Sequence, residues 1–267
     1  MDNRHQLLQP SDLNPVGEVR TQARSSFLLI ADHAGNAVPE RLGDLGISAK
    51  DMNRHIGIDI GIHEVSQQLS ELLDAPYLYQ PYSRLVIDCN RPPGNPTSIV
   101  PVSDGTRVPA NQELSVEDIA MRETEIFWPY QKAIAKQLEK MRKSGAPPTV
   151  IAMHSFTPKH GDYPASRPWH IGVLYGKDER LARPLISLLG QEGDLAIGIN
   201  QPYAVDNDVD YAIPVHCERG GLLHVELEIR QDLIQTPADQ RAWAQRLARL
   251  LPMALNSVQR IPRENEV

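Results

Sequence analysis

The 267-residue chain contains only two cysteines, Cys89 and Cys217, and no CxxC motif. A disulfide framework or a zinc site built from thiolates is therefore not expected. No apolar run approaches the ~20 residues that a membrane-spanning helix needs. The N-terminal stretch MDNRHQLLQPSD is polar and predicts neither a signal peptide nor a transit peptide. These absences predict a soluble, cytoplasmic protein.

An excess of positive charge is also missing. The chain has 27 Lys and Arg against 34 Asp and Glu, a formal net charge of -7, so neither nucleic acid nor a membrane surface is expected as a partner. Ser83 and Ser155 lack the G-x-S-x-G elbow of a serine hydrolase. Internal repeats, low-complexity segments and linkers that would divide the chain are absent, and nothing in the sequence indicates the oligomeric state.

What is present is ordinary globular composition, with 41% hydrophobic and 23% charged residues. The length is sufficient to bury a large core. Residues 1–24 are polar with scattered prolines and predict a loosely held N-terminal arm. Residues 25–267 are expected to form a single domain.

Alternating apolar runs and amphipathic stretches predict an α/β fold. The run FLLIA at 27–31 is continuously apolar, as in a strand buried on both faces of a sheet. Further strands are predicted at 77–79, 84–88, 149–153, 170–175, 195–198 and 221–230. Helices are predicted at 59–74, 113–144, 178–190 and 238–255, and long loops at 94–112, 156–168 and 199–214.

Two of these strands end in histidine. His33 follows the strand at 27–31, and His154 follows the strand at 149–153. Ligands of open α/β sheets bind beyond the carboxyl ends of the strands. The pair therefore predicts a shared site at one edge of the sheet, although each histidine alone could equally be an ordinary loop residue.

A catalytic zinc ion takes three ligands from His, Asp and Glu and leaves a fourth position for water. The carboxylate candidates are Asp32, Asp59, Glu64, Glu226 and Glu228. Asp59 is preferred, because it precedes a helix that follows the first strand closely. A competing local site would use His55, Asp59 and His63, spaced i, i+4 and i+8 on one helix face, but Gly57 and Gly61 interrupt that stretch.

The last strand alternates, with His224, Glu226 and Glu228 on one face. Buried carboxylates are costly unless they are used or paired. One interpretation is a solvent-exposed face. The other places a glutamate beside the metal-bound water as general base; Glu228 is nearer the carboxyl end of the strand, and Glu226 remains open.

Three arginines are candidates for holding a substrate carboxylate, since the guanidinium group binds carboxylates through two parallel hydrogen bonds. Arg84 and Arg91 flank the segment that contains Asn90, and Arg167 lies in the loop after His154. An acidic small-molecule substrate is therefore a hypothesis. The alternative is that each arginine forms an ordinary surface ion pair.

Six segments together resemble the N-formylglutamate amidohydrolase (deformylase) family. They are ADHAGNAVP (31–39), HIGIDIG (55–61), YSRLVIDCNRP (82–92), AMHSFTP (152–158), RPWHIGVLY (167–175) and HVELEIRQDLI (224–234). The six segments span nearly the whole chain and occur in the same order as in the family. The resemblance implies a single α/β domain with a mixed β-sheet flanked by helices on both faces, similar to zinc carboxypeptidases.

The resemblance also implies roles for individual residues. His33, Asp59 and His154 would be ligands of a zinc ion, Glu228 the base and proton shuttle, and Asn90 with Arg91 the holders of a substrate carboxylate. Arg84 would hold a second carboxylate or polarise the carbonyl. The sequence reads Asp-His-Ala-Gly where the deformylases have Pro-His-Ser-Gly, and Asn36 stands where related zinc peptidases have the glutamate of a His-x-x-Glu pair.

The reaction implied is hydrolysis of an N-acyl, preferably N-formyl, acidic amino acid such as N-formylglutamate to a carboxylate and a free amino acid. Two alternatives stay open. One is a zinc peptidase or amidase acting on another acyl amino acid, and the other is a non-catalytic carboxylate-binding protein on the same scaffold.

Overall fold

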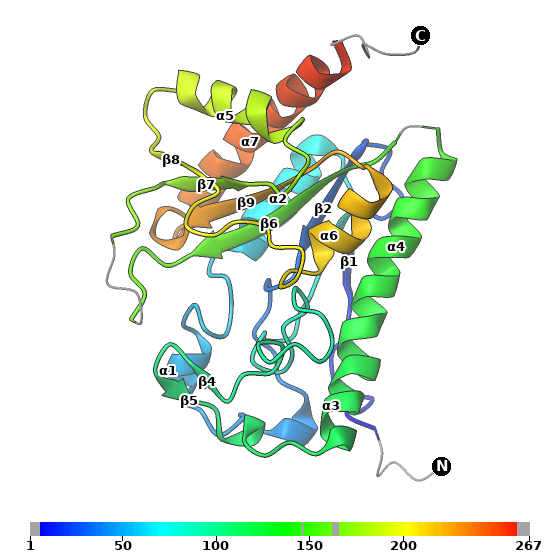
Figure 1. Cartoon of the computed structure of the whole chain (residues 1–267), viewed down its shortest axis with the longest axis vertical. Coiled ribbons are helices and arrows are strands. Elements are labelled where there is room, and N and C mark those ends of the chain that lie inside the picture. Colours follow the sequence, from blue (N-terminus) through cyan, green and yellow to red (C-terminus); the bar gives the residue numbers. More distant parts are fainter. Residues whose placement is uncertain (1–5, 146, 162–165, 261–267) are drawn as a thin grey trace.

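The computed structural model describes residues 6–145, 147–161 and 166–260. At its centre lies a seven-stranded sheet in the order β1-β3-β2-β6-β9-β7-β8 (Figure 1). The strands are β1 (Gly17–Val19), β2 (Phe27–Ala31), β3 (Tyr77–Tyr79), β6 (Thr149–Phe156), β7 (Ile171–Leu174), β8 (Ile197–Ile199) and β9 (His224–Arg230). Strands β3, β2, β6 and β9 are mutually parallel. β1 pairs antiparallel with β3, and β7 pairs antiparallel with β9 and parallel with β8. The predicted mixed-sheet α/β fold is confirmed.

Helices cover both faces of this sheet (Figure 1). They are α1 (Ala49–Met52), α2 (Ile62–Leu73), α3 (Val116–Arg122), α4 (Trp128–Lys143), α5 (Ala182–Gln191), α6 (Ala212–His216) and α7 (Pro237–Arg260). On one face Leu29, Ile151 and Leu227 pack with buried side chains of α2, α5 and α7. On the other face Leu28 and Val150 pack with α4 and α6. The alternation of successive strand residues between two cores follows from the period of the pleat.

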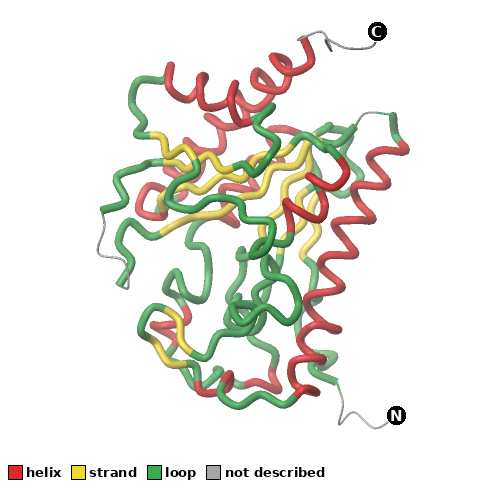
Figure 2. Tube along the Cα trace, in the orientation of Figure 1, coloured by secondary structure: helices red, strands yellow, loops and turns green. Residues whose placement is uncertain are grey.

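The loops that follow β2, β3 and β6 gather on one side of the sheet (Figure 2). They include α1 and a small hairpin of β4 (Val102–Ser103) and β5 (Thr106–Arg107). Because the central strands are parallel, their carboxyl ends all open toward these loops. The fold therefore places the segments after β2 and β6 next to each other. Within the described residues, no helix is both long and apolar enough to span a bilayer.

The strand predicted at 84–88 is wrong. The backbone N–H of Val86 donates to the carbonyl of Ser83 at 2.9 Å, and the backbone N–H of Leu85 donates to Ser83 Oγ at 3.2 Å, so the segment folds into a turn. Its apolar side chains are still buried, in the core under α4. The apolar residues of this segment therefore indicated that it is buried, not that it pairs within the sheet.

Other predicted boundaries also change. The strand expected over 149–153 continues to Phe156, so His154 lies within β6 and not after it. The helix expected over 113–144 begins at a capping box on Ser115 and is split by a π-helical stretch, Glu123–Phe127. The loop expected over 94–112 contains the β4–β5 hairpin, and the loop expected over 199–214 ends in α6.

The loose arm expected over residues 1–24 is wrong for the part that the structure describes. β1 pairs with β3, and the backbone N–H groups of Leu7 and Leu8 each donate to the carboxylate of Glu125 at 2.8 Å. Leu7 is fully buried. Residues 1–5 lie outside the described residues. The division of the chain into an arm and a domain at residue 25 stays a prediction.

Candidate active site

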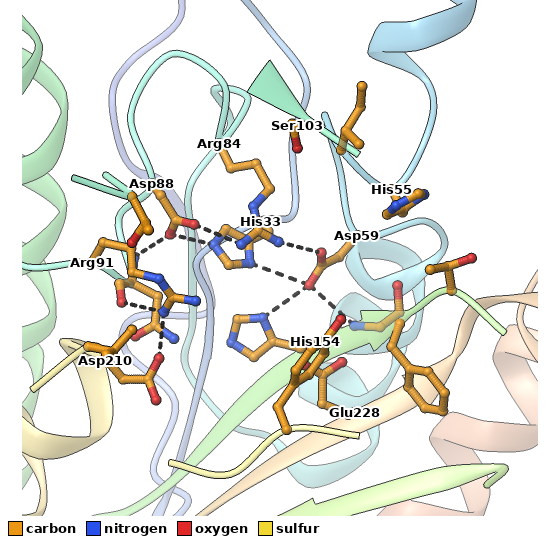
Figure 3. A pocket seen from close by; sticks show the side chains of 18 of the residues that line it. His33, His55, Asp59, Arg84, Asp88, Arg91, Ser103, His154, Asp210 and Glu228 are labelled. Carbon is orange, nitrogen blue, oxygen red and sulfur yellow. Dashed lines mark hydrogen bonds and ion pairs between the residues drawn. The ribbon is translucent and has the colours of Figure 1, made fainter. Parts of the chain in front are cut away.

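A pocket of about 560 Å³ opens at the carboxyl ends of the parallel strands. Side chains from the loops after β2 and β3, from β6 and from β9 meet in it (Figure 3). Its polar lining includes His33, Asp59, Arg84, Asp88, Asn90, Arg91, His154, Tyr203, Asp210, Glu226 and Glu228. All the predicted site residues except Arg167 therefore line one cavity.

His33, Asp59 and His154 are brought together at the base of this pocket. Asp59 Oδ2 lies 3.0 Å from His154 Nδ1 and 3.5 Å from His33 Nδ1. The backbone N–H of Asp59 donates to the carbonyl of His33 at 3.0 Å, which fixes the loop before α2 against the end of β2. One atom from each of the three side chains lies within 4.8 Å of the others, and all three side chains are buried.

The competing set of His55, Asp59 and His63 is not assembled. Residues 55–61 are not helical, since α2 begins only after Gly61, whose φ is 77°. No common helix face therefore exists. His63 instead approaches the Tyr77 hydroxyl at 3.2 Å, and His55 lies near Asp104 and His160.

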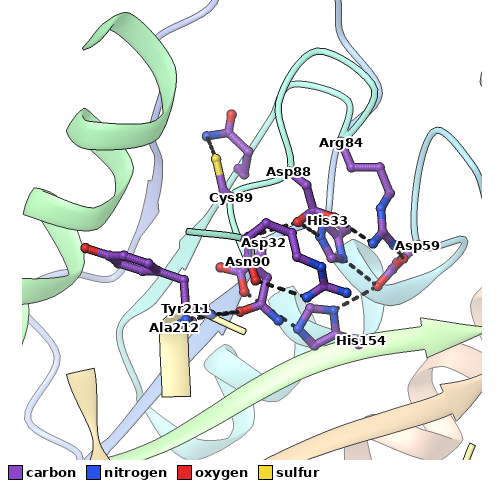
Figure 4. A network of polar contacts seen from close by, with 12 residues as sticks. Asp32, His33, Asp59, Arg84, Asp88, Cys89, Asn90, His154, Tyr211 and Ala212 are labelled. Carbon is purple, nitrogen blue, oxygen red and sulfur yellow. Dashed lines mark hydrogen bonds and ion pairs between the residues drawn. The ribbon is translucent and has the colours of Figure 1, made fainter. Parts of the chain in front are cut away.

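The ring orientations fit a metal ion. Both histidines direct Nδ1 toward Asp59 and Nε2 toward a second buried aspartate (Figure 4). His33 Nε2 lies 2.7 Å from Asp88 Oδ1, and His154 Nε2 lies 3.7 Å from Asp32 Oδ2. Metal-bound histidines almost always have an outer carboxylate or carbonyl partner, which fixes the tautomer. Asp88 is such a partner for His33, whereas the Asp32 carboxylate lies too far from His154 Nε2 for a hydrogen bond.

The distances at the triad also agree with zinc coordination. Bonds of about 2 Å at tetrahedral angles separate ligand atoms by about 3.3 Å, and Asp59 Oδ2 is 3.0 and 3.5 Å from the two imidazole nitrogens. His33 Nδ1 is buried and has no hydrogen-bond partner. The residues present therefore suit a divalent ion bound by two imidazoles and one carboxylate.

The local electrostatics keep Asp59 and Asp88 charged, whereas burial raises the pKa of Asp32. Burial opposes ionisation of Asp59, but His33 and His154 outweigh it and lower the pKa of that carboxyl. Burial likewise opposes ionisation of Asp88, and His33 together with Arg84 holds its pKa well below the usual range. The base of the pocket thus keeps anionic groups that attract a cation.

Glu226 and Glu228 reach the same pocket from β9. In the parallel register Glu228 stands opposite His154 and Glu226 opposite Ala152. Both glutamates are only 6% exposed, so the interpretation of this face as solvent-exposed is wrong. Burial raises the pKa of Glu226 to about 7 and that of Glu228 to about 8. Glu228 Oε2 has no hydrogen-bond partner, which leaves it available to a water or substrate.

The three predicted arginines are all engaged by protein groups. Arg84 donates to Asp88 at 2.7 Å and lies 3.6 Å from Asp59 Oδ1. Arg91 donates to Asp210 at 2.5 Å. Arg167 lies outside the pocket lining, donates to the Tyr203 hydroxyl at 3.0 Å, and has its guanidinium 5.0 Å from the centre of that ring. None of the three arginines forms an ordinary, exposed ion pair at the surface.

Asn90 has a structural contact as well. Its Oδ1 accepts from the backbone N–H of Ala212 at 3.0 Å and of Tyr211 at 3.2 Å, at the start of α6. Sequence analysis did not identify Asp88, Asp210 or Tyr203. Asp88 sits two residues before Asn90 in one of the family-like segments, and that proximity was the available signal.

Comparison with known proteins identifies the family. The family model described as N-formylglutamate amidohydrolase matches residues 25–235. The chain belongs to the N-formylglutamate amidohydrolase family. The resemblance identified in the sequence is thereby confirmed. A search of curated proteins gives no match.

Two solved structures resemble this family member over nearly its whole length. Gene product Atu2144 from Agrobacterium tumefaciens is 31% identical, with a TM-score of 0.91 over 95% of this chain and 100% of that one. N-formylglutamate amidohydrolase from Ralstonia eutropha JMP134 is 17% identical, with a TM-score of 0.66 over 93% of this chain and 99% of that one. The second likeness concerns the fold alone.

Proposed function

We propose that this protein is a metal-dependent amidohydrolase that cleaves the amide bond of an N-acyl amino acid. N-formyl amino acids with an acidic side chain, such as N-formylglutamate, are the preferred substrates. Family membership supports the hydrolase class. The observation that carries the proposal is the convergence of two Nδ1 atoms and Asp59 Oδ2 on one point, with Glu228 opposite His154 in the sheet.

His33, Asp59 and His154 would hold the ion through Nδ1, a carboxylate oxygen and Nδ1. A zinc ion held there supplies Lewis acidity and lowers the pKa of a water toward ~7. Asp88 keeps the His33 imidazole in the orientation that the ion needs, through His33 Nε2, and Asp32 lies 3.7 Å from His154 Nε2 without a hydrogen bond.

Glu228 is proposed as the general base. Its carboxylate takes one proton from the attacking water while the water oxygen bonds to the acyl carbon. It then delivers that proton to the nitrogen as the C–N bond breaks. The second proton of the water then passes from the new carboxylic acid to the amine, so the products are a carboxylate, formate for a formyl group, and the protonated amine. Positioned proton transfer of this kind contributes about 10²–10⁴-fold.

Arg84 and Arg91 are proposed to orient the substrate. Arg84 is fixed beside the triad by Asp88 and Asp59, which suits it to the acyl oxygen or a nearby carboxylate. Arg91 lies farther along the pocket with Asn90, and its partner Asp210 occupies the position that a substrate carboxylate would take. Arg167 supports Tyr203, which lines the cavity.

Formate release from N-formyl-L-glutamate tests the proposal, with N-acetyl-L-glutamate and an N-formyl neutral amino acid as comparisons. Turnover should stop after chelation and return when zinc is restored. Binding of the acidic compounds without any turnover would instead favour the carboxylate-binding alternative. Cleavage of peptides in place of N-acyl amino acids would favour a zinc peptidase.

A further inference from the structure

A second group of imidazole and carboxylate side chains lies at the rim of the pocket. It consists of His55, Asp104 and His160, which come from three separate segments. His55 is in the loop before α2, Asp104 in the turn of the β4–β5 hairpin, and His160 in the loop after β6. His55 and His160 also line the cavity that holds the triad, and Figure 3 shows His55 beside Asp59, close to the hairpin residue Ser103.

Both histidines of this cluster approach the same carboxylate, each at a different oxygen. His55 Nε2 lies 3.3 Å from Asp104 Oδ2, and His160 Nδ1 lies 3.3 Å from Asp104 Oδ1. The ring centres are 5.5 Å apart and the rings are nearly edge-on. One ligand atom from each of the three residues lies within 4.8 Å of the others, and a tetrahedral ion with bonds of about 2 Å would draw such atoms to about 3.3 Å from one another. His55 Nε2 is buried and makes no hydrogen bond.

The carboxylate of Asp104 is held in place by other groups. The backbone N–H of Gly161 donates to its Oδ1 at 2.8 Å, and Arg54 donates to its Oδ2 at 2.8 Å. Asp104 has a φ of 42°, as a hairpin turn before Gly105 requires. The hairpin thus presents the carboxylate rigidly to both imidazoles, while the charge of Arg54 opposes a cation and should make this site weaker than the buried triad.

A purely structural ion pair explains Arg54 but leaves the buried Nε2 of His55 without a hydrogen bond. That atom lies 3.3 Å from the Asp104 carboxylate and still makes no hydrogen bond to it. A neutral imidazole nitrogen in such a position is the form that ligates zinc and other first-row ions.

We propose that His55, Asp104 and His160 form a second divalent-metal site, of the class that binds zinc. The ion would connect the β4–β5 hairpin to the loop after β6 and so fix the outer rim of the pocket. This site is separate from the triad of His33, Asp59 and His154, and it does not depend on the reaction assigned to that triad.

Zinc stoichiometry tests the proposal. The full-length chain is stripped with chelator, equilibrated by dialysis against micromolar zinc, and analysed for bound metal. We expect two equivalents in the unaltered protein and one in Asp104→Asn and in His160→Asn. The His33→Ala variant should also keep one, and His63→Ala, a histidine outside both sites, should keep two. Circular dichroism spectra establish that each variant is folded.

Thermal unfolding supplies a second readout that does not need activity. In His33→Ala, added zinc should raise Tm, because an ion that binds only the folded chain stabilises it. In His33→Ala/His160→Asn that rise should disappear. The proposal is overturned if Asp104→Asn and His160→Asn both bind as much zinc as the unaltered protein. Failure of N-formyl substrates to turn over would leave these counts unchanged, so the two proposals fail independently.

Discussion

The carboxylate of Asp59, just before α2, lies 3.0 Å from Nδ1 of His154 at the far end of β6. His33, after β2, completes the group at 3.5 Å. Because each ligand comes from a different segment, no neighbouring residue can substitute for one that is lost. We expect His33→Ala and His154→Ala each to lose the zinc of this site by elemental analysis. His63→Ala should keep it, and zinc retained at the triad in both of the first two variants would refute the assignment.

Asp88 should act on the metal through His33. It accepts from His33 Nε2 at 2.7 Å and from Arg84 at 2.7 Å. Loss of such an outer partner typically costs 10–100-fold in metal affinity. We expect Asp88→Asn to weaken zinc binding by about that factor, measured by competition with a chelator of known affinity. Asp210→Asn is the matched control, since Asp210 lines the same pocket but bonds to Arg91. Equal affinities for Asp88→Asn and the unaltered chain would contradict this role.

Substitution of each of the two glutamates of β9 should show which of them is the general base. Glu228 stands opposite His154, and Glu226 is two residues farther from the carboxyl end. We expect Glu228→Gln to keep its zinc and its fold but to lose kcat by about 10²-fold or more. Glu226→Gln should have the smaller effect. If turnover in Glu228→Gln is unchanged, or if Glu226→Gln has the larger loss, the general base is not Glu228.

The sequence was sufficient for the parts of this site that depend on local order. A continuous apolar run followed by a polar break marks the end of a buried parallel strand, which holds for β2 and His33. β6 continues past His154 to Phe156, so this histidine lies within the last residues of its strand, still at the same edge. The alternation on β9 likewise placed Glu226 and Glu228 on a common face. Parallel pairing then brings the ends of β2, β6 and β9 together without further information.

The contacts between distant loops could not be predicted in this way. The segment 84–88 is as apolar as a strand, yet Ser83 turns it away from the sheet, and that choice depends on the core it packs against. The pairing of Asp88 with His33, and of Asp210 with Arg91, joins residues with no periodic relation. The same is true of Asp104 between His55 and His160. Such contacts are fixed by tertiary packing alone.

Asp210 should compete with the substrate for Arg91. Its carboxylate accepts from the guanidinium at 2.5 Å in a partly buried position. A substrate carboxylate must break this pair before Arg91 can bind it. Hydrogen bonds to charged groups contribute about 1.5–3 kcal/mol, so Asp210→Asn should lower KM for an acidic N-acyl amino acid roughly tenfold, with kcat little changed. A KM that rises in Asp210→Asn would instead show that Asp210 helps to hold the substrate or the loop.

His216, on α6, should make the protein less stable in acid for a reason unrelated to the metal. Its Nε2 lies 2.7 Å from Gln131 Oε1, and burial lowers its pKa to about 4 from the ordinary 6.5. The unfolded chain therefore binds this proton more readily than the folded chain. The stabilising contribution is complete above pH 6.5 and is lost as the pH falls from 6.5 toward 4. Its upper limit is about 3 kcal/mol, reduced by partial exposure.

His216→Gln tests this directly by urea unfolding at neutral pH and near pH 4.5, with chelator present so that metal release does not contribute. The unaltered protein should lose on the order of 2 kcal/mol more than the variant across this range. Lys136→Gln, at an exposed position of α4, removes a charge that does not titrate there and should behave as the unaltered protein does. Equal losses in His216→Gln and Lys136→Gln would mean that His216 takes up its proton as readily in the folded chain as in the unfolded one.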